Sequence, residues 1–225
     1  MKKLVIAIDG PAGAGKSTVA RLVAKKLNYT YIDTGAMYRG VAWKVLQATP
    51  ASIAEDFIYE IVKDIIIELN YVDGKIQVMV DGNDVTDVIR TPEVTELVSK
   101  VAQISKVREK MVMLQQMMAQ NGGVVMDGRD ICTYVLPDAD VKLFLTASIE
   151  ERAMRRWKEL KDKGYNIELE KLKEEIAARD KADSEREIAP LIQAEDAKLL
   201  DTTKLSIDEA VVEILALCEC DQHVV

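Results

Sequence analysis

The chain has 225 residues, of which 48% are hydrophobic and 30% charged, and its formal net charge at pH 7 is −8. This length suits one domain, or one core with insertions, that can bury a proper hydrophobic core. The acidic balance argues against a nucleic-acid-binding protein, which would present a basic face, although a local arginine cluster could still bind an anionic small molecule. No apolar run is long enough to span a bilayer, so we expect no membrane partner.

The amino terminus and the cysteines favour the cytoplasm. Residues 1–3 carry two lysines, as a signal peptide would, but the strand that follows must stay in place to carry the motif described next. The three cysteines, Cys132, Cys218 and Cys220, do not make a disulfide framework. Cys218 and Cys220 lie near His223 but lack a second ligand pair, which disfavours a structural zinc site.

Residues 10–17 follow the G-x-x-x-x-G-K-[ST] pattern of a phosphate-binding loop. Its glycines permit positive φ angles and let phosphate oxygens reach backbone N–H groups, and the helix that follows adds unpaired N–H groups and the positive end of its dipole. We therefore expect nucleotide phosphates to bind along the loop, at Gly10, Pro11, Ala12, Gly13, Ala14, Gly15, Lys16, Ser17 and Thr18.

The end of this loop carries the chemistry. Lys16 would place positive charge on the β- and γ-phosphates, and the hydroxyl of either Ser17 or Thr18 could ligate Mg²⁺. An apolar run over residues 4–8 precedes the loop and apolar residues at helical spacing follow it, which is the expected strand, loop and helix. The alternative, a glycine-rich turn that binds nothing, has no use for the Gly-Lys-Ser ending.

A second strand over residues 29–32 is followed by a helix with Thr34 as its expected N-cap. Ligands of open α/β sheets bind beyond the carboxyl ends of the strands, which brings Asp33, Thr34 and Arg39 beside the phosphate loop. Two alternatives remain open, because Arg39 could be a solvated helix charge and Tyr38 could be partly core packing.

Residues 53–107 lack the alternation of strand and helix seen elsewhere. A helix around residues 57–62 is followed by strands over 65–71 and 75–80, joined at Asp73-Gly74 in a hairpin pattern. We interpret this segment as an insertion with its own small antiparallel sheet, placed over the substrate end of the site.

The rest of this insertion ends in helices. A short strand is expected at Val85, and Thr91 should cap a helix with Pro92 in its first turn. Apolar residues continue at helical spacing over 101–118, where the methionines are interpreted as core filling and Arg108 would be an ordinary surface charge.

A buried strand ending at Asp127 is followed by Gly128, Arg129 and Asp130. In phosphate-loop enzymes an acidic residue at such a strand end often orders Mg²⁺, directly or through water. Charges just past a buried strand are costly unless they are paired or bound to a ligand. The alternative is a local ion pair of Arg129 with Asp127 or Asp130 and no ligand.

Two charged helices follow a further strand over residues 141–145. Ser148 and Glu151 form a capping box for the first helix, whose Arg152 and Arg156 share one face. The second helix leads to Arg179, Asp183 and Arg186, and we expect the pair to form a lid. A last strand over 197–201 and a helix capped by Ser206 close the chain.

Five stretches together resemble the cytidylate kinases of bacterial type, in the nucleoside monophosphate kinase superfamily: residues 9–18, 33–39, 127–130, 137–139 and 189–191. The resemblance covers essentially the whole chain and implies an α/β fold of the P-loop NTPase type. This fold has three layers, α/β/α, with a five-stranded parallel sheet as the middle layer. It also has an insertion with a small antiparallel sheet, and a helical lid. Within one kinase domain it implies a core over 1–35, 120–147 and 190–225, a monophosphate-binding region over 36–119 and a lid over 148–189.

The resemblance also implies an activity, namely phosphoryl transfer from ATP to CMP or dCMP with Mg²⁺, giving ADP, in a cytoplasmic monomer that belongs to pyrimidine metabolism. Another phosphate-loop kinase for a small acceptor, such as a UMP/CMP kinase, is the alternative. A nucleotide switch is disfavoured because the chain has no Asn-Lys-x-Asp motif.

Site residues carry over from the family by position. The catalytic set would be Lys16, Asp127, Arg129 and Arg186, and Arg152 and Arg156 would join the loop in binding ATP. The residues expected to bind CMP are Thr34, Tyr38, Arg39, Ser99, Arg108, Arg129, Asp130, Arg179, Asp183 and Arg186, of which Ser99, Arg108 and Asp130 would read the cytosine. Two positions depart from the family. Cys132 stands where a Gly is usual, which disfavours a close approach of the backbone at residue 132 to a ligand. Ser17 stands where some members have Gly.

Overall fold

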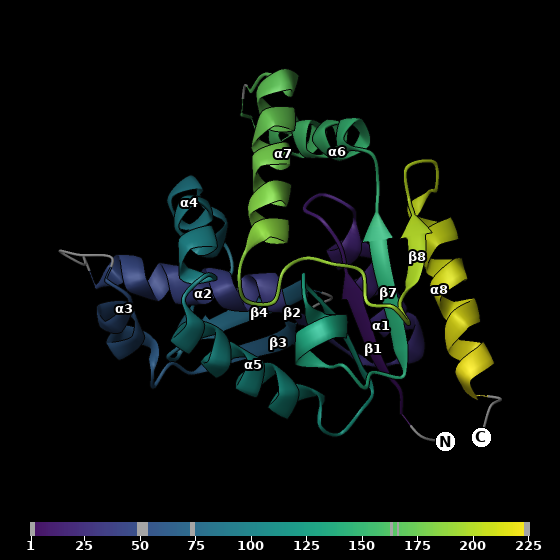
Figure 1. The fold of residues 1–225 in the computed structure, drawn as a ribbon, viewed down its shortest axis with the longest axis horizontal. Helices are drawn as coiled ribbons and strands as arrows, with labels where there is room; N and C mark the ends of the chain where they lie inside the picture. Colours follow the sequence, from purple (N-terminus) through teal and green to yellow (C-terminus); the bar gives the residue numbers. More distant parts are fainter. Residues whose placement is uncertain (1–2, 49–53, 73–74, 163, 166, 223–225) are drawn as a thin grey trace. The chain divides into compact units, whose positions relative to one another are not determined.

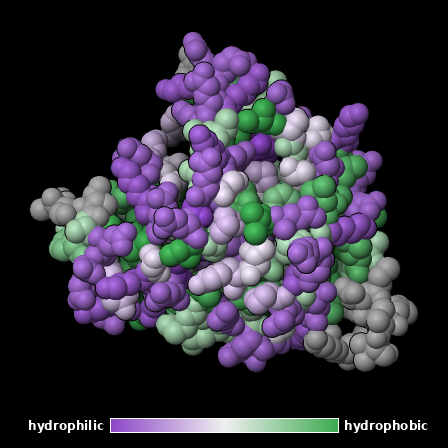
Figure 2. Space-filling view, viewed as in Figure 1, coloured by the Kyte–Doolittle hydropathy of each residue, from purple (hydrophilic) through white to green (hydrophobic). Residues whose placement is uncertain are grey.

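The structure is a computed structural model that describes residues 3–48, 54–72, 75–162, 164–165 and 167–222. The chain divides into two compact units, one formed by Met1–Tyr31 with Asn121–Val225 and the other by Ile32–Gln120. Among the described residues, no helix is both long and apolar enough to cross a bilayer. Figure 2 shows a mostly hydrophilic face with scattered apolar side chains.

The first unit is built on a five-stranded sheet in the order β2-β6-β1-β7-β8. β1 pairs in parallel with β6 and β7, and β7 pairs in parallel with β8, so the carboxyl ends of these strands lie at one edge. The predicted five-stranded parallel core is thus confirmed. The strands are β1 (Val5–Asp9), β2 (Thr30–Asp33), β6 (Val124–Asp127), β7 (Val141–Thr146) and β8 (Lys198–Asp201).

The apolar run in β1 follows from its central place in this sheet. Ile6, Ala7 and Ile8 are all 0% exposed, because a central parallel strand is covered on both faces. Helices α1 (Lys16–Leu27) and α8 (Ile207–Gln222) pack together, α1 against β6 and α8 against β7. Figure 1 shows β7 between β1 and β8, in keeping with the order of the strands in the sheet.

Two helices of the first unit, α6 (Ile149–Asp162) and α7 (Leu169–Glu185), pack against each other and cross in Figure 1. The N–H of Glu151 donates to Ser148 Oγ at 3.2 Å, so Ser148 caps α6 as predicted. The reciprocal half of the predicted capping box is wrong, because the Ser148 N–H donates to Thr203 Oγ1 at 2.9 Å and the Glu151 carboxylate accepts from Arg155. The predicted cap of α8 is also present, because Glu209 N donates to Ser206 Oγ and the Ser206 N–H and hydroxyl donate back to the Glu209 carboxylate.

The second unit contains the antiparallel sheet expected of the insertion, in the order β3-β4-β5. The hairpin predicted from its apolar pattern is confirmed, while its turn residues Asp73 and Gly74 lie outside the described residues. The elements are α2 (Thr34–Gln47), α3 (Glu55–Val62), β3 (Ile67–Val72), β4 (Lys75–Val80), β5 (Asn83–Asp84), η1 (Val88–Arg90), α4 (Pro92–Val101) and α5 (Ser105–Ala119).

Several local predictions in this unit are wrong. The third strand is Asn83–Asp84 and stops before Val85, whose side chain is buried. Thr34 is the first residue of α2 and does not cap it. The cap is Asp33, because its carboxylate reaches Ala36 N at 2.8 Å. Thr91 does precede α4, but its side chain makes no capping hydrogen bond.

The helical pattern that we extended across residues 101–118 is interrupted between α4 and α5. The break is stabilised by Arg108, whose Nη1 donates to the carbonyl of Ala102 at 3.1 Å and so satisfies a group at the end of α4. The methionines of α5 are only partly core filling, since Met111 is 0% exposed but Met113 and Met117 are about half exposed.

Candidate active site

The phosphate loop begins where β1 ends and turns directly into α1. Gly10 has a φ of +144°, and a Cβ built there would lie 1.8 Å from the carbonyl oxygen of Leu145, so no other residue fits. Gly15 has a φ of +88° and occupies the N-cap position of α1. The loop therefore carries the backbone that its glycine spacing predicts.

Lys16 is buried at the start of α1, and its ammonium donates to the carbonyls of Gly10 at 2.7 Å and Pro11 at 2.8 Å. Burial lowers the pKa of Lys16 to about 7, and the nearby positive charges of Arg129 and Arg179 act in the same direction. Asp127 and Asp9 oppose this shift, but the summed environment still disfavours the ammonium.

The environment of Arg179, like that of Lys16, disfavours the charged form of its side chain. Burial and the charge of Arg129 lower the pKa of Arg179, and its Nε is buried without a hydrogen-bond partner. The positive charge of Arg129 thus lies close enough to disfavour the charged forms of both Lys16 and Arg179. Such clustering is costly in a folded protein unless the site is built to receive an anion.

Asp127 ends β6 and is 4% exposed. Its Oδ2 accepts a hydrogen bond from Ser17 Oγ at 2.9 Å, and its Oδ1 accepts one from the Tyr31 hydroxyl at 2.7 Å. A carboxylate next to a hydroxyl is the oxygen donor set that Mg²⁺ prefers. No three His, Cys, Asp or Glu side chains gather to hold a metal in the described part of the chain.

Two ion pairs follow β6. Arg129 Nε donates to Asp183 Oδ2 of α7 at 2.8 Å, and Arg186 Nη2 lies 3.5 Å from Asp130 Oδ1. Arg186 Nε also donates to the Ala189 carbonyl at 2.6 Å. The local alternative, in which Arg129 pairs with Asp127 or Asp130, is therefore wrong: its partner comes from a helix more than fifty residues away.

Arg152 of α6 is buried against the loop. Its Nε donates to the Ala147 carbonyl at 2.9 Å, and its Nη1 donates to the Ala12 carbonyl at 3.0 Å and to Asp180 of α7 at 2.6 Å. Arg156, one turn later, instead pairs with Glu159 on its own helix, and its side chain is 39% exposed.

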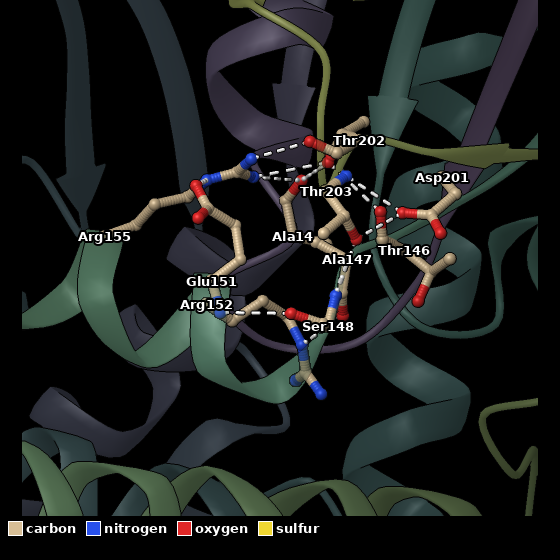
Figure 3. A network of polar contacts seen from close by, with 10 residues as sticks. All are labelled: Ala14, Thr146, Ala147, Ser148, Glu151, Arg152, Arg155, Asp201, Thr202 and Thr203. Atoms are coloured by element: carbon tan, nitrogen blue, oxygen red, sulfur yellow. Dashed lines mark hydrogen bonds and ion pairs between the residues drawn. The ribbon is translucent and has the colours of Figure 1, made fainter.

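Arg155 is a loop contact that sequence reasoning did not select. Its Nη1 lies 3.5 Å from the Ala14 carbonyl oxygen and donates to Thr202 Oγ1 at 3.2 Å, and its Nη2 donates to the Thr202 carbonyl at 2.8 Å. Figure 3 shows Arg155 extending from α6 to join the loop at Ala14 to the turn after β8. The sequence could have indicated this contact, because Arg155 follows Arg152 by three residues and positions i and i+3 share a helix face as i and i+4 do.

The remaining predicted residues belong to the second unit. Arg39 of α2 donates to Thr95 Oγ1 at 2.8 Å, so the alternative of a purely solvated charge is wrong. Arg108 is 2% exposed and lies 5.9 Å from the ring centre of Tyr38, so the surface charge expected from its periodicity is also wrong. Tyr38 is half-buried, which agrees with partial core packing. Thr34 is buried and Ser99 is half-buried on α4.

Cys132 lies in a single π-helical turn over Ile131–Val135. Its side chain is buried, with Sγ 3.5 Å from the Ala7 carbonyl oxygen and 3.6 Å from that of Leu143. The thiol therefore fills space in the core between β1 and β7, and burial raises its pKa. Cys218 is buried on α8, while the side chain of Cys220 and His223 lie outside the described residues.

The class of protein follows from four features of this unit. The sheet is parallel, a glycine loop follows its central strand, a lysine begins the next helix, and a carboxylate ends the neighbouring strand. This combination is that of a P-loop nucleotide-binding protein. The family model described as cytidylate kinase matches residues 6–220. Cytidylate kinases from Bacillus cereus (strain ATCC 10987 / NRS 248) and Bacillus anthracis (strain A0248) are each 56% identical over 216 residues, covering 96% of this chain and 96% of theirs. The chain therefore belongs to the cytidylate kinase family.

One solved structure has a similar fold at low sequence identity. An uncharacterized protein from Eubacterium ventriosum ATCC 27560 has a TM-score of 0.54 and 13% identity, over 97% of this chain and 99% of that one. This likeness concerns the arrangement of the elements alone.

Proposed function

We propose that the protein transfers the γ-phosphoryl group of ATP to CMP, giving ADP and CDP, and that it accepts dCMP in the same way. Membership of the family and the names of its relatives support this reaction. The observation that carries it is the group of neighbouring cationic side chains, Lys16, Arg129 and Arg179, where the phosphate loop begins, in which burial and nearby positive charge disfavour the charged forms of Lys16 and Arg179. Polyanionic phosphates would offset that repulsion.

ATP phosphates would lie along the backbone N–H groups of residues 10–18, with Lys16 leaving the carbonyls of Gly10 and Pro11 for the phosphate oxygens. Arg152 supports this role because it holds the Ala12 carbonyl from α6. Arg156 would reach the ATP phosphates only after leaving Glu159, which is inexpensive because exposed ion pairs contribute little.

Mg²⁺ would be held by Ser17 and Asp127. The contact between Ser17 Oγ and Asp127 Oδ2 favours Ser17 over Thr18 as the hydroxyl ligand, because it brings both oxygen donors together. When bound, the ion supplies positive charge to the β- and γ-phosphates. Tyr31 would keep Asp127 in place through the opposite carboxylate oxygen.

The acceptor phosphate would be bound by arginines. In the first unit Arg129 and Arg186 are each held beside a carboxylate, Asp183 and Asp130 respectively, which orients the guanidinium groups without neutralising the whole cluster. Arg179 would reach the phosphates from α7. In the second unit we assign the phosphate to Thr34 and Arg39, with Tyr38 packed beside Arg108.

The cytosine would be read by Ser99, Arg108 and Asp130. Arg108 is buried on α5, where the Ala102 carbonyl and the Tyr38 ring fix its guanidinium group, and a rigid donor discriminates between bases better than a mobile one. A cytosine presents one donor and two acceptors on its pairing edge, so a carboxylate and an arginine suit it.

Transfer would then proceed in line from ATP to a CMP phosphate oxygen. The acceptor is a phosphate monoester that is largely ionised near neutral pH, so no general base is required. Lys16 and the arginines first offset the repulsion between the two nucleotides and then stabilise charge on the moving phosphoryl group. The helical pair α6 and α7 would limit access of water, which competes as an acceptor.

The test is a coupled assay of ADP release with ATP and each of CMP, dCMP, UMP, AMP and GMP. We expect turnover with CMP and dCMP that exceeds turnover with the other three. Equal or faster turnover with UMP would refute the assignment to CMP, and ADP release that ignores every acceptor would refute a kinase. Light scattering on the same preparation tests the expected monomer, and fractionation of cells tests the expected cytoplasmic location.

A further inference from the structure

Asp9 is a buried carboxylate that the proposed reaction leaves without a role. It is the last residue of β1, directly before Gly10, and its side chain is 0% exposed. Oδ1 accepts a hydrogen bond from Ile131 N at 2.8 Å, and Oδ2 accepts one from Cys132 N at 2.7 Å. One carboxylate therefore pairs with two successive backbone N–H groups of another segment.

The segment that Asp9 holds is the one that follows Arg129 and Asp130. Ile131 and Cys132 begin the π-helical turn, and both are almost fully buried. Because these two N–H groups are held, the backbone of the two preceding residues has little conformational freedom. From this backbone the Arg129 side chain contacts Asp183 and the Asp130 side chain contacts Arg186.

A carboxylate in this place is costly, which indicates a specific requirement. Burial raises the pKa of Asp9 to about 6, and the charge of Asp130 acts in the same direction, while the two backbone hydrogen bonds oppose it. The carboxylate offers a separate oxygen to each N–H group. An asparagine would place an NH₂ where one of these oxygens lies, and a serine or threonine has a single oxygen to share, so each would satisfy the two N–H groups less well.

We propose that Asp9 is a positioning residue that fixes Arg129 and Asp130 relative to the phosphate loop and so sets the binding of the acceptor nucleotide. This inference rests on the proposed transfer to CMP. Asp9 is joined covalently to the loop for the donor phosphates and by two hydrogen bonds to the segment for the acceptor. Its loss should therefore affect the acceptor more than the donor, because the loop keeps its own glycine geometry and Lys16.

The test is Asp9→Asn, which keeps the shape but turns an amide NH₂ toward one of the two N–H groups. We expect the KM for CMP to rise about ten-fold or more and kcat to fall about 10- to 100-fold, as for a misplaced binding group, while the KM for ATP changes less than about three-fold. Assays run well below the melting temperature of each variant.

Asp140→Asn is the matched control. Asp140 Oδ2 accepts from Val5 N at 2.7 Å, so it holds the first residue of the same strand, at the end away from the loop. We expect Asp140→Asn to lower the melting temperature and leave both KM values unchanged. If Asp9→Asn behaves like this control, Asp9 has only a structural role and the inference is wrong.

Two further results separate the possibilities. If Asp9→Asn does not fold, Asp9→Ser keeps one acceptor without the opposing NH₂, and the same rise in the KM for CMP is expected. Failure of both variants to fold would overturn the inference, since the side chain would then serve stability alone. A wild-type protein that neither binds nor phosphorylates CMP would overturn the proposed function and this inference with it, whereas an active wild type with an unchanged variant overturns this inference only.

Discussion

Replacing Lys16 with methionine should affect catalysis and the pH dependence of stability for the same physical reason. Methionine fills a similar volume but carries no charge. In the folded protein, burial lowers the pKa of Lys16 from 10.5 to about 7, and Arg129 adds to the shift. In the unfolded chain the pKa returns to its ordinary value.

The sign follows from proton binding. Between pH 7 and pH 10.5 the unfolded chain holds a proton on Lys16 that the folded protein has released, so the free energy of unfolding of the wild type rises with pH across this window. Burying the ammonium costs about 4 kcal/mol at pH 7 and about 2 kcal/mol at pH 9. The wild type should thus gain about 2 kcal/mol relative to Lys16→Met between these two pH values.

The stability measurement is urea unfolding of both proteins at pH 7 and pH 9, followed by circular dichroism. Lys158→Met, which removes an exposed lysine of α6, is the control and should keep a constant difference from the wild type. The coupled assay on the folded variant should show a loss of about 10²- to 10⁵-fold in kcat/KM, since one charge stabiliser of the transferring phosphoryl group is gone. A stability difference that does not change with pH would refute the burial of a cation here, and near wild-type turnover would refute its catalytic role.

Three further predictions concern other parts of the site. Gly10→Ala should destabilise the fold by about 3 kcal/mol or more, or prevent folding, because its Cβ would overlap the Leu145 carbonyl. The control Gly82→Ala has no atom within 4 Å of its Cβ and should cost about 1 kcal/mol for its positive φ. Equal melting temperatures of the two variants would contradict this prediction. Arg108→Met should weaken selectivity for CMP over UMP by about 1–3 kcal/mol and leave the KM for ATP nearly unchanged, so unchanged selectivity in a two-substrate competition would reject its contact with the base. Arg155→Met should raise the KM for ATP about three- to ten-fold with little change for CMP, since it frees the phosphate loop from the turn after β8, and an effect on CMP alone would show that the contact serves another purpose.

Local sequence determined the features that depend on neighbours in the chain. The glycine loop is set by positive φ angles that few residues other than glycine adopt, so the spacing of its glycines was sufficient to predict it. The capping box at Ser206 follows the same logic, since Ser206 and Glu209 lie within one turn. At Ser148 only the hydroxyl half of the predicted box forms, because the Ser148 N–H donates to Thr203 Oγ1 of a distant segment.

Predictions were wrong in detail where the local sequence is compatible with two structures. Asp33 and Thr34 can each cap a helix, and the structure uses Asp33 because its carboxylate reaches Ala36 N. The apolar spacing across residues 101–118 fits one helix or two. The structure has two helices, and Arg108 turns inward and stabilises the break by donating to the carbonyl of Ala102, a contact that periodicity could not indicate.

The site depended most on tertiary structure. Ser17 meets Asp127 across 110 residues, and Asp9 meets Cys132 across 123, because parallel strands bring their carboxyl ends to one edge whatever the length of chain between them. Arg152, Arg155 and Arg156 are equivalent charges in the sequence, yet only the first two lie against the loop, since the packing of α6 decides which face is buried. The chain alone thus determined which groups are available for phosphate chemistry, while the assembled sheet and helices decided which of them meet, because electrostatic and hydrogen-bond contacts depend on distance in space and not along the sequence.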